Sequence, residues 1–290
     1  MKHYTHLINT LALVAAGLLL VFTGQARADL ADSTDPALQS ALEQTIIELG
    51  LDDESRAGVL AVALADLSGP GKPRLAMING HEMFYAASLP KIAILLGAAA
   101  TLDDGTLTMD AALEQDLHEM IRVSCNECAS RVLERVGRER LLALLQSPEY
   151  HFYDEQAGGG LWVGKPYGPE PAYRRDPVDN QSHGATVYQA ARFYYLLHRR
   201  ELVSPEQSEM MLETLARPGI PHKFVKGLES YEDIEIYRKS GSWKHFHADS
   251  ALVTTENKAY VMVALVEDPD GSELLERLAP SLHELIVGEP

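Results

Sequence analysis

The feature that most constrains this sequence is a run of apolar residues at 86–102. Ile92, Ala93, Ile94 and Leu95 follow one another there, so a helix over this segment carries apolar side chains on nearly every side. A helix that is apolar all round is stable only when other elements surround it. We therefore expect a buried central helix, in a chain whose 290 residues allow one large domain or two closely packed subdomains.

Segments typical of β-strands lie near both ends of the chain. They occupy residues 58–66, 74–79, 234–243, 248–254 and 259–267. The first two flank a turn cluster, Ser68-Gly69-Pro70-Gly71, and predict a β-hairpin. Apolar residues at helical spacing predict terminal helices over 36–51 and 272–286. We expect the two chain ends to build an antiparallel sheet flanked by these helices.

Helical spacing dominates the middle of the chain. The predicted helices are residues 109–123, 127–136, 139–145 and 185–198. Residues 147–184 lack regular spacing and hold Gly158-Gly159-Gly160, and a loop of this length is usually functional or mobile. The predicted fold class is therefore α/β, of the α+β type. Residues 29–86 and 219–290 form an α/β subdomain, and residues 87–218 form an all-helical inserted subdomain that carries the loop.

Residues 1–28 have the pattern of a secretory signal peptide. Lys2 precedes an apolar run at 7–22, and Ala26-Arg27-Ala28 fits the cleavage site. An uncleaved membrane anchor is the alternative, but Asn9 and Thr10 and the small residues at the end favour cleavage. We expect a soluble periplasmic or secreted protein with no stable membrane span after cleavage.

The charge of the chain excludes two classes of partner. Acidic residues outnumber basic ones by 42 to 25, and the formal net charge is -17. Such a surface repels phosphate backbones and anionic lipids, and the sequence contains no basic patch that offsets this repulsion. We expect no nucleic-acid partner and no role at a membrane surface.

Ser88-Leu89-Pro90-Lys91 stands at the start of the predicted central helix. A serine in the first turn and a lysine three residues later project from the same side of a helix. A neutral lysine amine at a helix N-terminus can activate the hydroxyl as a nucleophile. The alternative is a capping serine with a solvated lysine, and this motif alone does not decide between them.

Two further short motifs add to this pattern. Ser124-Cys125-Asn126 lies at a break between two predicted helices, and Lys239-Ser240-Gly241 lies on the first strand of the last third. Together the three motifs resemble the S-x-x-K, S-D-N and K-T-G set of class A β-lactamases and penicillin-binding proteins. The resemblance extends over residues 29–290. It implies a β-lactamase-like fold and an active-site-serine hydrolase.

The resemblance implies a role for each motif residue. Ser88 would be the acylated nucleophile, and Lys91 would accept its proton. Ser124 would relay a proton to the leaving nitrogen, and Asn126 would donate a hydrogen bond to the side-chain amide of the substrate. Lys239 would place positive charge near Ser124 and the substrate carboxylate. No cofactor is expected.

Other substrate contacts would come from the strand of the third motif. Ser240 and Ser242 alternate onto one face of the strand, where their hydroxyls could bind a carboxylate. Gly241 would let the substrate backbone lie close, and the backbone N–H groups of Ser88 and Ser242 would form the oxyanion hole. The implied substrate is a small molecule or peptidoglycan stem peptide that carries a carboxylate, namely a β-lactam or a D-Ala-D-Ala-type amide.

The long loop departs from the β-lactamase pattern. Where class A enzymes have a run resembling W-E-P-E-L-N, the nearest match is Tyr167-Gly168-Pro169-Glu170-Pro171-Ala172. Gly168 replaces the glutamate that serves as general base in deacylation, a contribution of about 10² to 10⁴ in rate. Three hypotheses follow: a serine hydrolase that deacylates slowly, an efficient class A-type β-lactamase that uses Glu155 or Glu170, or a catalytically weak protein that binds cell-wall peptides.

Cys125 and Cys128 form a C-x-x-C pair beside the second motif. In an oxidising compartment they could close a small disulfide, and buried free thiols or metal or redox chemistry are the alternatives. His245 and His247 share one strand face, but no nearby cysteine or run of carboxylates completes a metal site. Histidines held by hydrogen bonds are therefore favoured, and we expect no bound metal.

Overall fold

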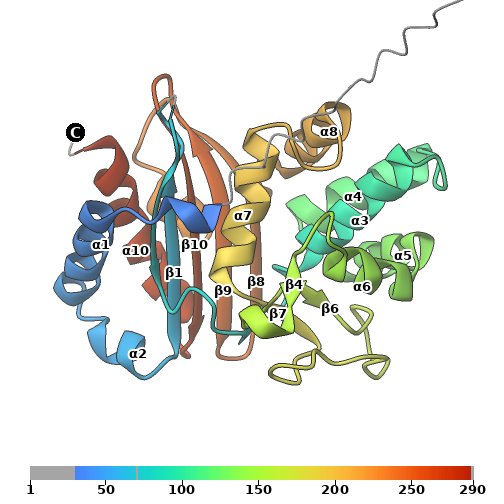
Figure 1. Ribbon diagram of the computed structural model, residues 1–290, viewed down its shortest axis with the longest axis horizontal. Helices are drawn as coiled ribbons and strands as arrows, with labels where there is room; N and C mark the ends of the chain where they lie inside the picture. The colour runs from blue at the N-terminus through green and yellow to red at the C-terminus, as the bar shows by residue number, and fades with distance from the viewer. Residues whose placement is uncertain (1–29, 70, 289–290) are drawn as a thin grey trace, which may run out of the picture.

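The computed structural model describes residues 30–69 and 71–288. Figure 1 shows a sheet with helices on both faces and a second group of helices beside it. The sheet has five strands in the order β2-β1-β10-β9-β8, so both ends of the chain contribute to it. This arrangement confirms the predicted α+β fold. The predicted signal peptide, residues 1–28, lies outside the described residues.

Neighbouring strands in this sheet are all antiparallel. The strands are β1 (Leu60–Asp66), β2 (Arg74–Ile78), β8 (Glu235–Trp243), β9 (Phe246–Thr254) and β10 (Ala259–Glu267). Every residue of β1 is buried. Because both faces of the sheet are covered, residues 60–65 of this strand form a continuous apolar run rather than an alternating one. The pairing of β1 with β2 confirms the predicted hairpin.

Helices cover both faces of the sheet. α1 (Pro36–Glu48) and α10 (Gly271–Val287) share a hydrophobic cluster with Leu64 of β1. α7 (Val187–His198) packs on the opposite face, toward which Ala63 points. α7 therefore contacts the sheet although it belongs to the predicted helical subdomain, and the subdomain boundaries stay a prediction.

The second group of helices surrounds α3 (Lys91–Asp103). Its neighbours are α4 (Ala111–Arg122), α5 (Asn126–Val136), α6 (Arg138–Gln146) and α8 (Pro205–Leu215). All residues of α3 from Lys91 to Thr101 are buried, which confirms the predicted central helix. The helix begins later than residue 86, because the chain leaves the short strand β3 (Phe84–Tyr85) through a turn in which Ala87 has a positive φ of 51°.

The long loop at 147–184 is tied into the fold by short elements. These are β4 (Tyr153–Asp154), η2 (Glu155–Ala157), β5 (Gly159–Gly160), β6 (Trp162–Val163) and β7 (His183–Ala185). β7 lies between β3 and β6, so the loop is anchored to the segment that leads into α3. At Gly160 a Cβ would lie 2.0 Å from the carbonyl oxygen of Phe152, and this close approach requires glycine.

Some short elements and one longer helix were not predicted. They are η1 (Leu30–Ser33), α2 (Asp52–Arg56), α8 and α9 (Phe224–Gly227). α8 has a recognisable start, because Ser204 accepts a hydrogen bond from Gln207 N (3.3 Å) and Pro205 is the first helical residue. Within 30–69 and 71–288, none of the helices has the length and apolar character to cross a bilayer.

Candidate active site

Lys91 is the first residue of α3, and its side chain is fully buried. Its Nζ donates hydrogen bonds to the carbonyl oxygen of Ser124 (2.6 Å), to Ser124 Oγ (3.2 Å) and to Asn126 Oδ1 (2.8 Å). Burial lowers the pKa of Lys91 to about 7, and the Glu127 carboxylate opposes this effect. Near neutral pH a large fraction of the protein therefore carries a neutral amine that can accept a proton.

Ser124 lies at the break between α4 and α5 and has a positive φ of 62°. The backbone N–H of Cys125 donates to the carbonyl oxygen of Glu119 (3.1 Å), which holds the break in place. Ser124 Oγ accepts hydrogen bonds from Lys91 (3.2 Å) and from Lys239 Nζ (3.0 Å). Its own proton is left to donate to a bound molecule, as a proton relay requires.

Lys239 projects from β8 and is 1% exposed. Burial, together with the positive charge of Lys91, holds the pKa of Lys239 well below its usual value. The preceding residue, Arg238, forms a buried bidentate ion pair with Asp249 on β9, with Nε–Oδ1 and Nη2–Oδ2 distances of 2.7 Å. No motif in the sequence indicates this ion pair. It holds β8, the strand from which Lys239 projects, against β9.

Ser88 lies in the turn before α3, and its side chain is partly exposed. Among the described residues, neither its Oγ nor its backbone N–H has a hydrogen-bond partner. β8 approaches this turn closely, because a Cβ at Gly241 would lie 2.2 Å from the carbonyl oxygen of Ala86 and 2.8 Å from Ser88 N. Glycine is therefore required for β8 to lie against the Ser88 turn.

Lys223 is a further buried lysine at the site that no sequence motif marks. Its Nζ donates to the carbonyl oxygens of Gly241 (2.5 Å) and Ala248 (3.1 Å) and to Ser242 Oγ (2.8 Å). Burial lowers the pKa of Lys223 to about 7. The two serines expected to bind a carboxylate thus differ in exposure. Ser242 is exposed and its hydroxyl accepts a hydrogen bond from Lys223, whereas Ser240 is 5% exposed.

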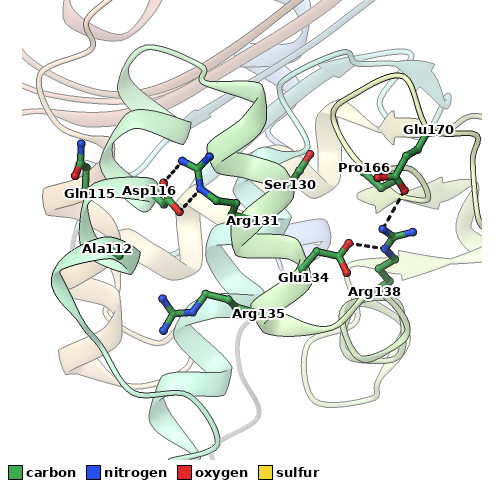
Figure 2. A pocket seen from close by; sticks show the side chains of 10 residues that line it. All are labelled: Ala112, Gln115, Asp116, Ser130, Arg131, Glu134, Arg135, Arg138, Pro166 and Glu170. Carbon is green, nitrogen blue, oxygen red and sulfur yellow. Dashed lines mark hydrogen bonds and ion pairs between the residues drawn. The ribbon is translucent and has the colours of Figure 1, made fainter.

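The loop glutamates considered as deacylation bases do not contact the buried lysines. Glu170 forms an ion pair with Arg138 (3.1 Å) on the wall of a separate pocket of about 730 Å³, between α4, α5 and the loop (Figure 2). Glu155 is exposed in η2, and Gly168 is exposed with open space where a Cβ would stand. In the described part of the chain, no carboxylate of this loop contacts Lys91.

Tyr167 lies beside Lys91 instead. Lys91 Nζ is 4.6 Å from the centroid of the Tyr167 ring, and the tyrosine hydroxyl donates to the carbonyl oxygen of Ala87 (3.1 Å). His183 packs on the same ring, with 4.2 Å between the centroids, and burial lowers the pKa of His183 to about 4. The loop therefore presents an aromatic ring, rather than a carboxylate, to Lys91.

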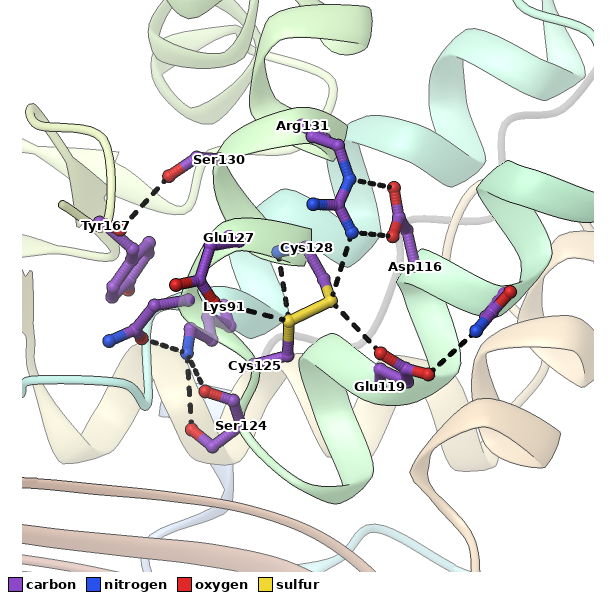
Figure 3. Close-up of a disulfide and its surroundings, with 12 residues drawn as sticks. Lys91, Asp116, Glu119, Ser124, Cys125, Glu127, Cys128, Ser130, Arg131 and Tyr167 are labelled. Carbon is purple, nitrogen blue, oxygen red and sulfur yellow. Dashed lines mark hydrogen bonds and ion pairs between the residues drawn. A yellow bond between two sulfur atoms is a disulfide. The ribbon is translucent and has the colours of Figure 1, made fainter.

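A disulfide joins Cys125 and Cys128 on the first turn of α5 (Figure 3). The disulfide hypothesis is thus confirmed, and the hypothesis of free thiols is wrong. Within the described ranges, the one group of three potential metal ligands is Glu119 with these two cysteines, whose sulfurs are engaged in the disulfide. His245 Nε2 lies 3.3 Å from Glu267 Oε1. Both ring nitrogens of His247 are buried without a hydrogen-bond partner among the described residues, so the hydrogen-bonding hypothesis is wrong for His247.

Comparison with known proteins assigns the family. The model of Beta-lactamase2, the beta-lactamase enzyme family, matches residues 110–286. The chain belongs to the beta-lactamase enzyme family. This match confirms the resemblance carried by the three motifs, and the protein is an active-site serine hydrolase. A comparison with curated proteins gives no match.

Solved structures share the fold of this beta-lactamase family member. The beta-lactamase from Sphaerobacter thermophilus DSM 20745 has a TM-score of 0.67 at 18% identity, covering 87% of this chain and 98% of that one. TLA-1 extended-spectrum beta-lactamase has a TM-score of 0.67 at 14% identity, covering 87% and 98%. A PBP-A mutant, solved as an acyl-enzyme complex with penicillin G, has a TM-score of 0.64 at 18% identity, covering 87% and 96%.

Proposed function

We propose that this enzyme is acylated at Ser88 by β-lactams or by D-Ala-D-Ala-type amides of peptidoglycan stem peptides, and that it releases the acyl group slowly. The observation that carries the proposal is the contact of two buried lysines, Lys91 and Lys239, with the hydroxyl of Ser124. This proton-transfer group lies beside a serine turn that is partly exposed and has free hydrogen-bonding groups.

The acylation step uses these residues in sequence. Ser88 Oγ attacks the carbonyl carbon, and its proton passes to the neutral amine of Lys91. The backbone N–H groups of Ser88 and Ser242 stabilise the charge that develops on the carbonyl oxygen. When the C–N bond breaks, Ser124 donates its proton to the leaving nitrogen and recovers one from Lys91. The products are a Ser88 ester and an amine, which stays attached to the acyl group when the substrate is a β-lactam, so the protons balance.

A carboxylate on the substrate fits the charges at this site. The protein as a whole has a net charge of -17 and repels anions. Lys239 supplies local positive charge when it is protonated, and we assign the hydroxyls of Ser240 and Ser242 to the substrate carboxylate. Asn126 would donate its amide N–H to the substrate, since its Oδ1 already accepts from Lys91 (2.8 Å).

Slow deacylation is supported by the composition of the loop. Hydrolysis of the ester needs a water molecule activated by a general base, a contribution of about 10² to 10⁴ in rate. Gly168 offers no side chain, Arg138 binds Glu170, and Tyr167 lies next to Lys91. These features favour a penicillin-binding enzyme over an efficient β-lactamase. Residues 1–28 predict export to the periplasm, which would bring the enzyme to peptidoglycan.

Intact-protein mass spectrometry with penicillin G tests the proposal. We expect a persistent adduct with the full mass of the drug, and we expect Ser88→Ala to lose it. Ser281→Ala, on α10 next to α1, is the matched control and should keep the adduct. An adduct that survives in Ser88→Ala overturns the nucleophile assignment. Rapid release of hydrolysed drug would instead favour an efficient β-lactamase, and no reaction would favour a weak binding protein.

A further inference from the structure

The disulfide occupies a position between two residues of the site. Cys125 stands between Ser124 and Asn126, both of which accept hydrogen bonds from Lys91. Cys125 is also the N-cap of α5, because its Sγ accepts a hydrogen bond from the backbone N–H of Cys128 (3.1 Å). The disulfide therefore restrains the backbone that contains Asn126 and directly follows Ser124, the two residues that bind Lys91.

The two sulfur atoms have different surroundings (Figure 3). Cys125 is partly exposed, whereas Cys128 is 1% exposed. Arg131 Nη2 and Glu119 Oε2 each lie 3.4 Å from Cys128 Sγ. An incoming thiolate thus has access to Cys125. The Arg131 guanidinium stabilises Cys128 as the departing thiolate and offsets the repulsion from the Glu119 carboxylate.

The reduced form of the pair would also be stabilised here. α5 has 11 residues, and the N–H groups and dipole at its N-terminus favour a thiolate at Cys125. The Glu127 carboxylate, 4.0 Å from Cys125 Sγ, opposes this effect. A protonated Cys128 could donate to the Glu119 carboxylate, 3.4 Å away. A disulfide whose reduced form is stabilised is opened more readily than a purely structural one.

We propose that the Cys125–Cys128 disulfide is a thiol–disulfide exchange site for a dithiol reductant, and that its opening slows acylation at Ser88. A thiolate of the reductant attacks Cys125 Sγ and forms a mixed disulfide, while the protein S–S bond breaks and Cys128 leaves as a thiolate. The second thiol of the reductant then attacks the reductant sulfur that is bonded to Cys125, and Cys125 is released as a thiolate. The reductant is oxidised to a disulfide by two electrons, and its two protons pass to the cysteines or to solvent.

The effect on acylation follows from the position of the pair. Once the disulfide is open, the backbone around Cys125 gains conformational freedom. Ser124 and Asn126 are then no longer held in one arrangement about Lys91. Misplacement of a catalytic group by about 1 Å can cost about 10² in rate, so a modest relaxation of this turn is enough to slow the reaction.

The first experiment follows the disulfide itself and is independent of the chemistry at Ser88. The folded wild-type protein is treated with dithiothreitol, quenched with iodoacetamide at successive times and digested for peptide mass spectrometry. We expect both cysteines to be reduced and alkylated without denaturant, and any dithiothreitol trapped as a mixed disulfide to be on Cys125, with the first alkyl group on Cys128. A disulfide that stays closed in the folded protein, or a mixed disulfide on Cys128, overturns the exchange site.

The second experiment measures the coupling, and this part rests on the proposed acylation of Ser88. Labelling by a fluorescent penicillin is timed for oxidised, reduced and reoxidised protein. We expect a loss of about tenfold or more on reduction, with recovery on reoxidation. The double variant Cys125→Ser/Cys128→Ser should be slow with or without dithiothreitol. Equal rates in oxidised and reduced protein overturn the coupling. If the oxidised protein is never labelled, the proposed function fails while the first experiment still decides the exchange site.

A pair of variants on α5 tests the leaving-group role of Arg131. Arg131→Gln should slow the opening by dithiothreitol several-fold, and Arg131→Lys, which keeps the charge, should restore part of the rate. Arg135→Gln is the control, because Arg135 pairs with Asp110 (2.8 Å) one turn further along the helix. Circular dichroism checks folding, since Arg131 also pairs with Asp116. Equal opening rates for the two glutamine variants contradict the role of Arg131.

Discussion

Lowering the pH should slow acylation at Ser88, because it protonates Lys91. Burial lowers the pKa of Lys91 from 10.5 to about 7. For one group that titrates there, the neutral fraction is about 90% at pH 8, about 10% at pH 6 and about 1% at pH 5. We therefore expect the rate to fall by about tenfold per pH unit below pH 7 and to level off above about pH 8.

The same shift affects stability in a defined direction. Because the folded-state pKa of Lys91 lies below its ordinary value of 10.5, the unfolded chain binds more protons than the folded protein between about pH 7 and pH 10.5. The contribution of Lys91 to the free energy of unfolding therefore rises with pH in this window. Below about pH 7 both states are protonated, and the cost of burying the charge applies in full.

The assay times the labelling of Ser88 by a fluorescent penicillin across the pH range, with circular dichroism at each pH to verify that the protein is folded. Glu127→Gln should move the midpoint to lower pH, because the Glu127 carboxylate raises the pKa of Lys91. Glu134→Gln is the control, since Glu134 lies on the same helix and pairs with Arg138 (2.6 Å). A rate that stays flat from about pH 5 to about pH 9 in folded protein would refute Lys91 as the proton acceptor.

Four further substitutions test other parts of the site. Gly241→Ala should slow labelling by about 10² and lower stability by about 1–3 kcal/mol, because its Cβ would lie 2.2 Å from the carbonyl oxygen of Ala86; unchanged labelling and thermal unfolding would contradict this. Gly168→Glu should speed the loss of the penicilloyl adduct in mass spectra, because the position is open and free of positive φ. Glu170→Gln should change that rate little, and a trapped acyl-enzyme in this variant would revive the β-lactamase hypothesis. Lys223→Met should raise the penicillin concentration needed for half-maximal acylation without abolishing it, because Ser242 loses a hydrogen-bond donor; an unchanged concentration dependence would exclude this role.

The central helix was predictable because composition alone demands its burial. A segment with apolar side chains on every side has no stable position at a surface, and α3 is indeed buried from Lys91 to Thr101. The hydrogen bond from Lys91 to Ser124 joins residues that are 33 positions apart in the sequence. Local spacing carries no information on such a contact, and only the resemblance of the three motifs to a known superfamily indicated it.

Other parts of the site were not predictable from local patterns. A charged residue in a loop is ordinarily solvated, so nothing near Lys223 in the sequence marks it as buried. Its partners include Ala248 on β9, which follows 25 residues later. Arg238 and Asp249 are likewise buried only because β8 and β9 pair in one register. By contrast, the start of α8 at Ser204 has a clear capping pattern, so that helix could have been found.

The position of β8 at the edge of the sheet has a consequence for what can associate with this protein. Ala216 bridges to Tyr237 and so occupies the outer side near the start of the strand. Among the described residues, no strand pairs with the outer side from Lys239 onward. An unpaired edge attracts strands of other chains and promotes aggregation, but this one is short and begins at a lysine. A short extended peptide can add its backbone here beside Ser88, while another copy of the sheet finds too little edge to continue the ladder.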